Sequence, residues 1–155
     1  MSFRITGLDP IPFRPLFGLS DGALERRGIV RVTSDSMPGF PDRIELRDAA
    51  PGETLLLLNH VHHDVANPYR ASHAIYVREG ASRPYDETDA VPACMRARLL
   101  SVRAFDAGGM MVDADVVDGH ALEGTIERLF AKPEVAMLHA HYAKRGCYAA
   151  RIVRA

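Results

Sequence analysis

Two stretches of the chain alternate between hydrophobic and polar residues on either side of a short turn that ends in glycine. The first spans residues 99–117 with the turn Ala107-Gly108-Gly109, and the second spans residues 135–153 with the turn Lys144-Arg145-Gly146. A period of two residues is typical of a β-strand with one face on the core. Glycine suits the left-handed position of a three-residue hairpin loop. The pattern therefore predicts two β-hairpins.

In the second hairpin, the predicted register places hydrophobic residues opposite one another. The expected pairs are Tyr142 with Tyr148, Ala140 with Ala150, and Leu138 with Ile152. This register leaves four chemically versatile side chains on the other face: His139, His141, Cys147 and Arg151. A shift by one residue would mix the two faces, so the pattern itself favours this pairing.

The first hairpin follows the same logic. The expected hydrophobic pairs are Ala104 with Val112, Val102 with Ala114, and Leu100 with Val116. The other face then pairs Arg103 with Asp113 and Ser101 with Asp115, and an Arg–Asp cross-strand pair contributes about 0.2–1 kcal/mol. We expect both hairpins to share one sheet, with their hydrophobic faces on the core and one polar cluster on the opposite face. That cluster would comprise Arg103, Asp113, Asp115, His139, His141 and Arg151.

The other patterns predict further strands and three helices. Strands are expected over residues 2–8, 29–33, 43–47 and 73–77, and the continuous hydrophobic run 55–58 indicates a strand in the middle of the sheet. Helices are expected after the N-cap Ser20, from Pro92 to about Arg98, and after Asp118, the last with the stripe Leu122, Ile126, Leu129 and Phe130. Together these elements predict an α+β fold with a mostly antiparallel sheet and about three helices on its faces.

Composition and charge narrow the class of protein. The length of 155 residues predicts a single domain spanning residues 1–155. The net charge of −1 gives no reason to expect binding to nucleic acid or to an acidic membrane surface. There is no signal-peptide hydrophobic region and no long hydrophobic run. The two cysteines, Cys94 and Cys147, do not form a disulfide framework. We therefore expect a cytoplasmic protein.

The histidines are the first candidates for chemistry. His139 and His141 lie two residues apart on one predicted strand, so they point the same way and could bind a metal or act as an acid–base pair. A third ligand would have to come from Asp113, Asp115, His73 or the loop that holds His60, His62, His63 and Asp64. We favour the simpler interpretation of exposed imidazoles beside Arg151 and a solvated loop over residues 59–70, with no metal and no cofactor.

Other side chains suggest an anion site or a nucleophile. Tyr69 and Arg70 could hold an anion through a phenol and a guanidinium, or they could anchor their own loop. Cys147 could be a nucleophile if an imidazolium lay beside it, but we expect an inert thiol, because a lone cysteine on a strand is usually a small hydrophobic residue. Asp115 could act as an acid–base carboxylate.

Several long phrases resemble a bacterial family, the domain of unknown function family numbered 1203. They are FGLSD at 17–21, PYR at 68–70, HAIYVREGA at 73–81, LLSVRAFDAGGMMVDADVV at 99–117 and HAHYAKRGCYAARI at 139–152. The resemblance covers essentially the whole chain and implies a single-domain protein with no assigned activity. In the family pattern a cysteine often follows the proline at 41, and an asparagine often stands at 142. Here these residues are Asp42 and Tyr142, and the first departure argues against chemistry with two thiols.

These observations leave two main hypotheses and an alternative. An enzyme would place the catalytic candidates His139, His141, Cys147 and Asp115 beside the ligand-binding candidates Tyr69, Arg70, His73, Arg103 and Arg151, and would act on a small anionic substrate. A binding protein would use the same groups for an anionic ligand without chemistry. The alternative is a structural or interaction module that forms a homodimer through edge strands.

Overall fold

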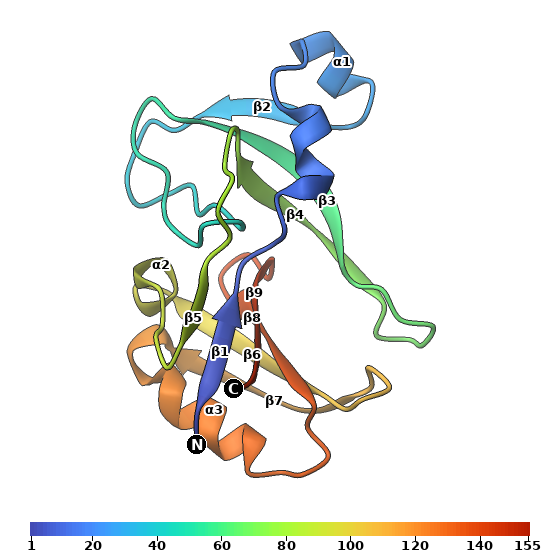
Figure 1. Cartoon of the computed structure of the whole chain (residues 1–155), viewed down its shortest axis with the longest axis vertical. Helices are drawn as coiled ribbons and strands as arrows, with labels where there is room; N and C mark the ends of the chain where they lie inside the picture. Colours follow the sequence, from blue (N-terminus) through green and yellow to red (C-terminus); the bar gives the residue numbers. More distant parts are fainter.

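The computed structural model describes residues 1–155 as two sheets with short helices around them (Figure 1). The strands are β1 (Phe3–Thr6), β2 (Val30–Thr33), β3 (Thr54–His63), β4 (Ala71–Arg78), β5 (Asp86–Thr88), β6 (Leu99–Phe105), β7 (Met111–Asp118), β8 (Met137–Tyr142) and β9 (Tyr148–Arg154). The α-helices are α1 (Asp21–Glu25), α2 (Ala93–Arg96) and α3 (Leu122–Phe130), and the 3-10 helices are η1 (Ile11–Leu16) and η2 (Gly119–Ala121). All paired strands run antiparallel, so the expected α+β class with about three helices is confirmed. None of the helices has the length and hydrophobicity needed to cross a membrane.

The larger sheet has six strands in the order β5-β1-β9-β8-β6-β7. It contains both predicted hairpins, which are joined through the antiparallel pair β6–β8. One face of this sheet packs on helix α3, whose predicted stripe of Leu122, Ile126, Leu129 and Phe130 is buried. A helix of nine residues is marginal alone, so this packing holds α3 in place. The prediction that both hairpins contribute to one sheet is confirmed.

The predicted register of the β6–β7 hairpin is wrong. Ala104 pairs with Asp113, and Val102 pairs with Asp115, because the register shifts between Ala104 and Phe105. The connection is longer than three residues: the Asp106 carboxylate accepts hydrogen bonds from the backbone N–H groups of Gly108 and Met110, each at 2.9 Å. The faces of β7 are therefore exchanged relative to the prediction, and the expected pairs of Arg103 with Asp113 and of Ser101 with Asp115 do not form.

The exchange changes where the β7 carboxylates lie. Asp113 accepts a hydrogen bond from Lys132 Nζ at 2.8 Å, and Asp115 pairs with Arg128, both beside helix α3. On the opposite face of β7, the side chains of Val112 and Val116 are exposed. The two aspartates thus satisfy cations at the helix instead of joining the histidines.

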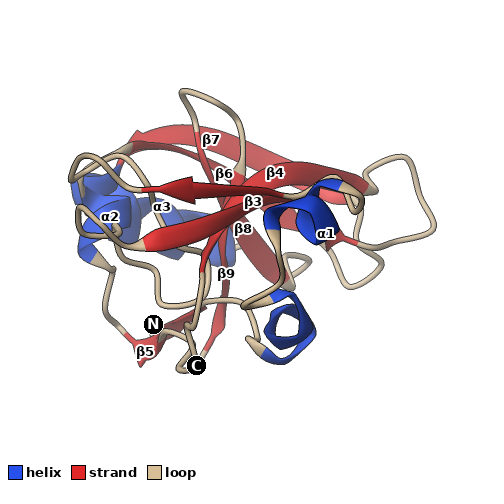
Figure 2. Cartoon of the chain, turned by 90° about the horizontal axis from the view of Figure 1, so that it is seen from above, coloured by secondary structure: helices blue, strands red, loops and turns tan.

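The smaller sheet has three strands in the order β2-β3-β4. Its central strand β3 runs from Thr54 to His63, so the predicted strand at 55–58 is correct in place but too short. Leu55 and Leu56 are fully buried, as expected for a central strand. The predicted solvated loop at 59–70 is wrong for residues 59–63, which continue the strand. Figure 2 shows β3 and β4 crossing over β6 and β8. The end of β3 and the start of β4 therefore lie against the open face of the larger sheet.

A tight turn at residues 41–46, in the connection between β2 and β3, contacts both sheets. The predicted strand at 43–47 is wrong, because these residues form a turn with only isolated bridges at Pro41 and Asp42. Its carbonyl groups accept hydrogen bonds from elsewhere: Leu8 N–H donates to Arg43 O and Tyr85 N–H donates to Ile44 O, each at 2.8 Å. The end of β1 therefore lies directly against this turn, at Gly7.

Candidate functional site

A β-bulge in the β8–β9 hairpin decides which side chains share a face. The predicted pairs Leu138–Ile152 and Ala140–Ala150 are confirmed, and His139 lies opposite Arg151. The register then shifts, so that His141 instead of Tyr142 pairs with Tyr148 and Ala149 is the extra residue.

The bulge exchanges the expected positions of two side chains. Tyr148 joins the histidine face, where its ring stacks on His62 at 4.8 Å between centroids. Cys147 lies with Tyr142 on the lining of a cavity on the other side. The expectation that Cys147 shares a face with His139 and His141 is therefore wrong.

Imidazole rings fill the space between the two sheets. The β3–β4 hairpin brings four histidines over the open face of the larger sheet, so that six of the seven histidines in the chain gather here: His60, His62, His63, His73, His139 and His141. The rings pack as aromatic groups, with His62 stacked on His73 at 4.8 Å and edge-on to His141 at 5.0 Å. We call this group the histidine layer.

Backbone carbonyls fix two of these imidazoles. His63 Nε2 lies 2.8 Å from Gly109 O, and His141 Nδ1 lies 3.0 Å from Gly146 O. Since a carbonyl oxygen only accepts, each of these nitrogens carries the hydrogen. The two glycines have φ of +79°, as the sequence predicted for both turns. The turns therefore orient the histidines as well as connecting the strands.

Burial lowers the pKa of several imidazoles of the histidine layer. It lowers the pKa of His139 to about 3 and that of His141 to about 2, because desolvation penalises the imidazolium and the neighbouring cations add to the effect. Burial also lowers the pKa of His62 to about 3, and it lowers the pKa of His73. At neutral pH these rings are neutral, each with one nitrogen lone pair available as a ligand.

The structure brings five of the predicted site residues together. His73, His139 and His141 belong to the histidine layer. Arg103 lies opposite His139 on β6, and Arg151 lies opposite it on β9. Arg103 is partly buried, and its positive charge contributes to the lowered pKa of the histidines around it.

The other predicted site residues lie elsewhere. Tyr69 and Arg70 are exposed in the β3–β4 connection, where Arg70 Nε donates to Asp64 at 3.1 Å. Asp115 lies beside helix α3, paired with Arg128. The nine predicted residues therefore do not form one site.

A separate cavity of about 530 Å³ opens beside the β8–β9 turn. Its walls come from the segment before Arg43, from β4, from the start of β6 and from the turn itself. The lining residues are Gly39, Pro41, Arg43, Tyr76, Ala97, Arg98, Leu99, Tyr142, Ala143, Lys144, Arg145 and Cys147. Four of them carry a positive charge and none carries a negative charge. We call this space the cationic cavity.

Arg43 is the unusual member of the cavity wall. Its side chain is only 1% exposed, yet no carboxylate pairs with it. The guanidinium donates to Tyr148 O at 2.7 Å, to Pro41 O, and to Cys147 Sγ at 3.1 Å, and it lies 4.8 Å from the centroid of the Tyr142 ring. A buried cation held only by neutral groups is electrostatically under-compensated.

A family model described as a protein of unknown function, DUF1203, matches residues 39–154. The chain belongs to the DUF1203 family. No curated protein and no solved structure gives a significant match. The DUF1203 match contains the whole histidine layer and every residue that lines the cationic cavity, whereas β1, α1 and β2 precede it. The resemblance noted from the sequence phrases is thus confirmed over residues 39–154, with the phrase FGLSD at 17–21 outside the match, and it brings no activity with it.

Sequence reasoning on this DUF1203 chain missed the cationic cavity. Arg43, Arg98, Lys144 and Arg145 come from three separate segments, and no spacing rule connects them. A signal existed for the histidine layer, because His60 and His62 lie two residues apart directly after the hydrophobic run at 55–58, as residues on one face of a longer strand would. The strand was not extended through these residues because histidine was treated as a polar loop residue. A neutral imidazole can instead pack between two sheets as an aromatic ring.

Proposed function

We propose that this DUF1203 protein binds a small organic anion in the cationic cavity. The observation that carries the proposal is Arg43, a buried guanidinium in the cavity wall without a carboxylate partner. A buried ion that lacks a counter-charge costs several kcal/mol. An anion bound in the cavity would supply that counter-charge and offset part of this cost.

The rest of the cavity wall supports the same ligand class. Lys144 and Arg145 form no ion pair, and their exposed position in the turn places two further charges at the cavity. Arg98 is neutralised by Asp48, with hydrogen bonds of 2.6 and 3.0 Å. Three cations therefore remain for a ligand. Guanidinium groups favour carboxylate and phosphate oxygens, because both anions accept paired hydrogen bonds.

The apolar part of the wall limits the body of the ligand. Leu99, Tyr76 and the Tyr142 ring present carbon surface beside the charges. Guanidinium carbons of Arg43 and Arg98 lie 4.8 and 5.1 Å from the centroid of that ring, which positions Tyr142 between the charged and apolar parts. A cavity of about 530 Å³ falls in the size range of small-molecule sites. The ligand class is therefore a compact molecule with one or two anionic groups and a small hydrophobic body.

Isothermal titration and thermal-shift measurements on the full chain test this proposal. The probes are inorganic phosphate, a series of aliphatic and aromatic carboxylates, and the matching organic phosphates, each compared with sodium chloride of equal ionic strength. We expect at least one organic anion to raise the Tm, and the double variant Lys144→Gln/Arg145→Gln to weaken its binding at least tenfold. Phosphate alone will distinguish a simple anion site from one that also requires the hydrophobic body.

Arg70→Gln is the matched control. Arg70 is an exposed arginine of the β3–β4 connection outside the cavity, paired with Asp64, so its loss should leave binding unchanged. Binding that is lost in Arg70→Gln but retained in the double variant would move the ligand to the Tyr69–Arg70 region and refute the cavity. If none of the anions exceeds the sodium chloride control at 10 mM, the proposal fails.

The homodimer is a second candidate. Strand β7 is an edge strand of the larger sheet, and it exposes Val112 and Val116 at 40% and 59%. An exposed hydrophobic edge strand readily pairs with another chain. Light scattering after gel filtration should then show a dimer that Val116→Lys converts to a monomer, and a monomeric wild type would remove this candidate.

A further inference from the structure

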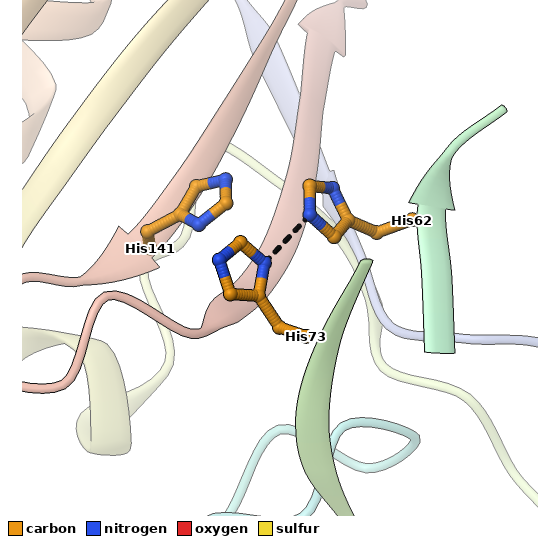
Figure 3. A group of neighbouring side chains, drawn as sticks. All are labelled: His62, His73 and His141. Atoms are coloured by element: carbon orange, nitrogen blue, oxygen red, sulfur yellow. Dashed lines mark hydrogen bonds between the residues drawn. The ribbon is translucent and has the colours of Figure 1, made fainter. Parts of the chain in front are cut away.

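Three histidines of the histidine layer face one another, each from a different strand. His62 comes from β3, His73 from β4 and His141 from β8, and Figure 3 shows their rings around a common space. One nitrogen from each ring lies within 4.8 Å of the other two. We propose that His62, His73 and His141 form a binding site for a late first-row transition-metal ion of the Zn²⁺ type.

His141 provides an observation that is independent of the clustering. Its side chain is fully buried, and its Nδ1–H donates to the Gly146 carbonyl at 3.0 Å. This hydrogen bond fixes the tautomer, so Nε2 carries the lone pair. That Nε2 atom is buried and has no hydrogen-bond partner. A metal-ligating histidine ordinarily donates its other N–H to a carbonyl or carboxylate in this way, which orients the ring and fixes the tautomer.

His62 and His73 are close to the spacing that a shared ion requires. His62 Nε2 and His73 Nδ1 are 2.7 Å apart and share one hydrogen (Figure 3). Two nitrogens bound to one tetrahedral Zn²⁺ would be about 3.3 Å apart, from Zn–N bonds of about 2.0–2.1 Å. A small rotation of either ring provides this separation. The shared hydrogen would move to the other nitrogen of its own ring, so the ligand atoms become free without net loss of a proton.

The chemistry of the donors selects the class of ion. All three donors are neutral imidazole nitrogens, and the proposed ligand set contains no carboxylate or carbonyl oxygen, so Mg²⁺ and Ca²⁺ are poor candidates. Nitrogen donors suit Zn²⁺, Cu²⁺ and Ni²⁺.

Arg103 is the charged group whose field acts on all three histidines, and its positive charge opposes a bare cation. Three protein nitrogens leave a tetrahedral ion one further position, which water or an anion would fill. Three histidines and one exchangeable position is the coordination of many catalytic zinc sites.

This site is distinct from the cationic cavity. His141 and Tyr142 are consecutive residues of β8, and consecutive side chains of a strand point to opposite faces. Tyr142 lines the cavity, whereas His141 lies in the histidine layer. The proposed metal site is therefore independent of the proposed anion site, and failure of one proposal does not affect the other.

Metal titration of the full chain tests the inference. The chain must be free of any histidine tag and treated with a chelator, and then titrated with Zn²⁺ by calorimetry and with Co²⁺ by visible absorption. We expect one ion per chain, absorption bands of nitrogen-coordinated Co²⁺, and a Tm increase of roughly 5–10 °C at one hundred times Kd. Mg²⁺ at the same concentration should leave the Tm unchanged.

Substitutions locate the ion. His73→Gln, at a partly exposed position, should keep the fold and weaken Zn²⁺ binding by about 100-fold or more. His62→Gln should act alike. Two matched controls are His60→Gln, in the same strand but outside the trio, and His120→Gln, an exposed histidine on η2. Both controls should bind as the wild type does.

Three results would overturn the site. The first is the absence of any Zn²⁺-dependent Tm increase in chelator-treated protein. The second is unchanged binding in both His73→Gln and His62→Gln. The third is equal loss in His60→Gln, which would indicate general disturbance of the histidine layer. Circular dichroism of each variant separates loss of the site from loss of the fold.

Discussion

Substitution of Gly7 by alanine should destabilise the fold through one steric contact between the end of β1 and the turn at residues 41–46. A Cβ atom at this position would lie 2.0 Å from the carbonyl oxygen of Ile44 and 3.1 Å from that of Arg43. Gly7 has no positive φ, so its backbone conformation is open to alanine. The entire effect must therefore come from the clash with the turn at residues 41–46.

The loss in the free energy of unfolding can be estimated from the contacts that the turn would lose. A carbon and an oxygen in contact need about 3.2 Å, so the Ile44 carbonyl would have to move by more than about 1 Å. Such a movement strains two hydrogen bonds, Leu8 N–H to Arg43 O and Tyr85 N–H to Ile44 O. Their loss costs about 0.5–1.5 kcal/mol each, and overpacking adds about 1–3 kcal/mol. The sum is about 4 kcal/mol, which lowers the Tm by roughly 10 °C for a chain of this size.

Urea unfolding and calorimetry of Gly7→Ala measure this loss, with Gly124→Ala as the control. Gly124 lies inside helix α3, and an added Cβ there meets no atom within 4 Å. The control should stabilise the protein by about 0.5–1 kcal/mol, because alanine favours the helix. Two glycine-to-alanine changes of the same chemistry should thus shift the stability in opposite directions.

Gly7→Ala also has a functional consequence. The displaced turn holds Arg43, so the variant should bind the organic anion more weakly than the wild type at a temperature where both are folded. A Gly7→Ala protein as stable as the wild type would refute the close approach between β1 and the turn.

Burial of His139 predicts acid sensitivity: its pKa is lowered to about 3, so below pH 6.5 the unfolded chain gains a proton at this residue that the folded chain does not, and His139 alone accounts for about 2 kcal/mol of the stability lost at pH 5. His139→Leu should remove this share of the pH dependence in urea unfolding, and equal slopes in variant and wild type would contradict the burial. A thiol reagent should label Cys147, which is partly exposed, more slowly than a free cysteine and leave the buried Cys94 unmodified in the folded chain, and a bound anion should slow Cys147 further; faster labelling than a free cysteine would instead indicate a nucleophile. Gly146→Val should cost about 1–2 kcal/mol by calorimetry, because φ is +79° and only the backbone conformation resists the side chain; an unchanged Tm would contradict the left-handed turn.

The sequence allowed the hairpins, the shared sheet and the helix stripe to be predicted, because these depend on local periodicity. Leu138–Ile152 and Ala140–Ala150 pair as the alternation required. The predicted registers were wrong where a strand contains an extra residue or where a turn is longer than three residues. The carboxylate of Asp106 that closes the β6–β7 connection is one such case, because its hydrogen bonds are set by the three-dimensional turn and leave no mark on the alternation.

The candidate sites were predicted less well than the fold. His139 and His141 were identified by spacing, and His73 was named as one source of a third ligand, but the role of His62 as a strand residue depended on the packing of one sheet over the other. Arg43 could not be singled out, because its burial results from a turn that the weak alternation at 43–47 presented as a strand.

The bulge at Ala149 has a consequence for protein engineering. Side chains of a strand normally alternate between its two faces. The extra residue interrupts this alternation in β9, so the residues before it lie on the opposite faces from those that an unbroken pairing with β8 would give. A deletion of that one residue would rotate Tyr148 and Cys147 past each other, moving a thiol among the imidazoles and a phenol towards the guanidinium of Arg43. One codon thus separates two chemically different versions of the same hairpin.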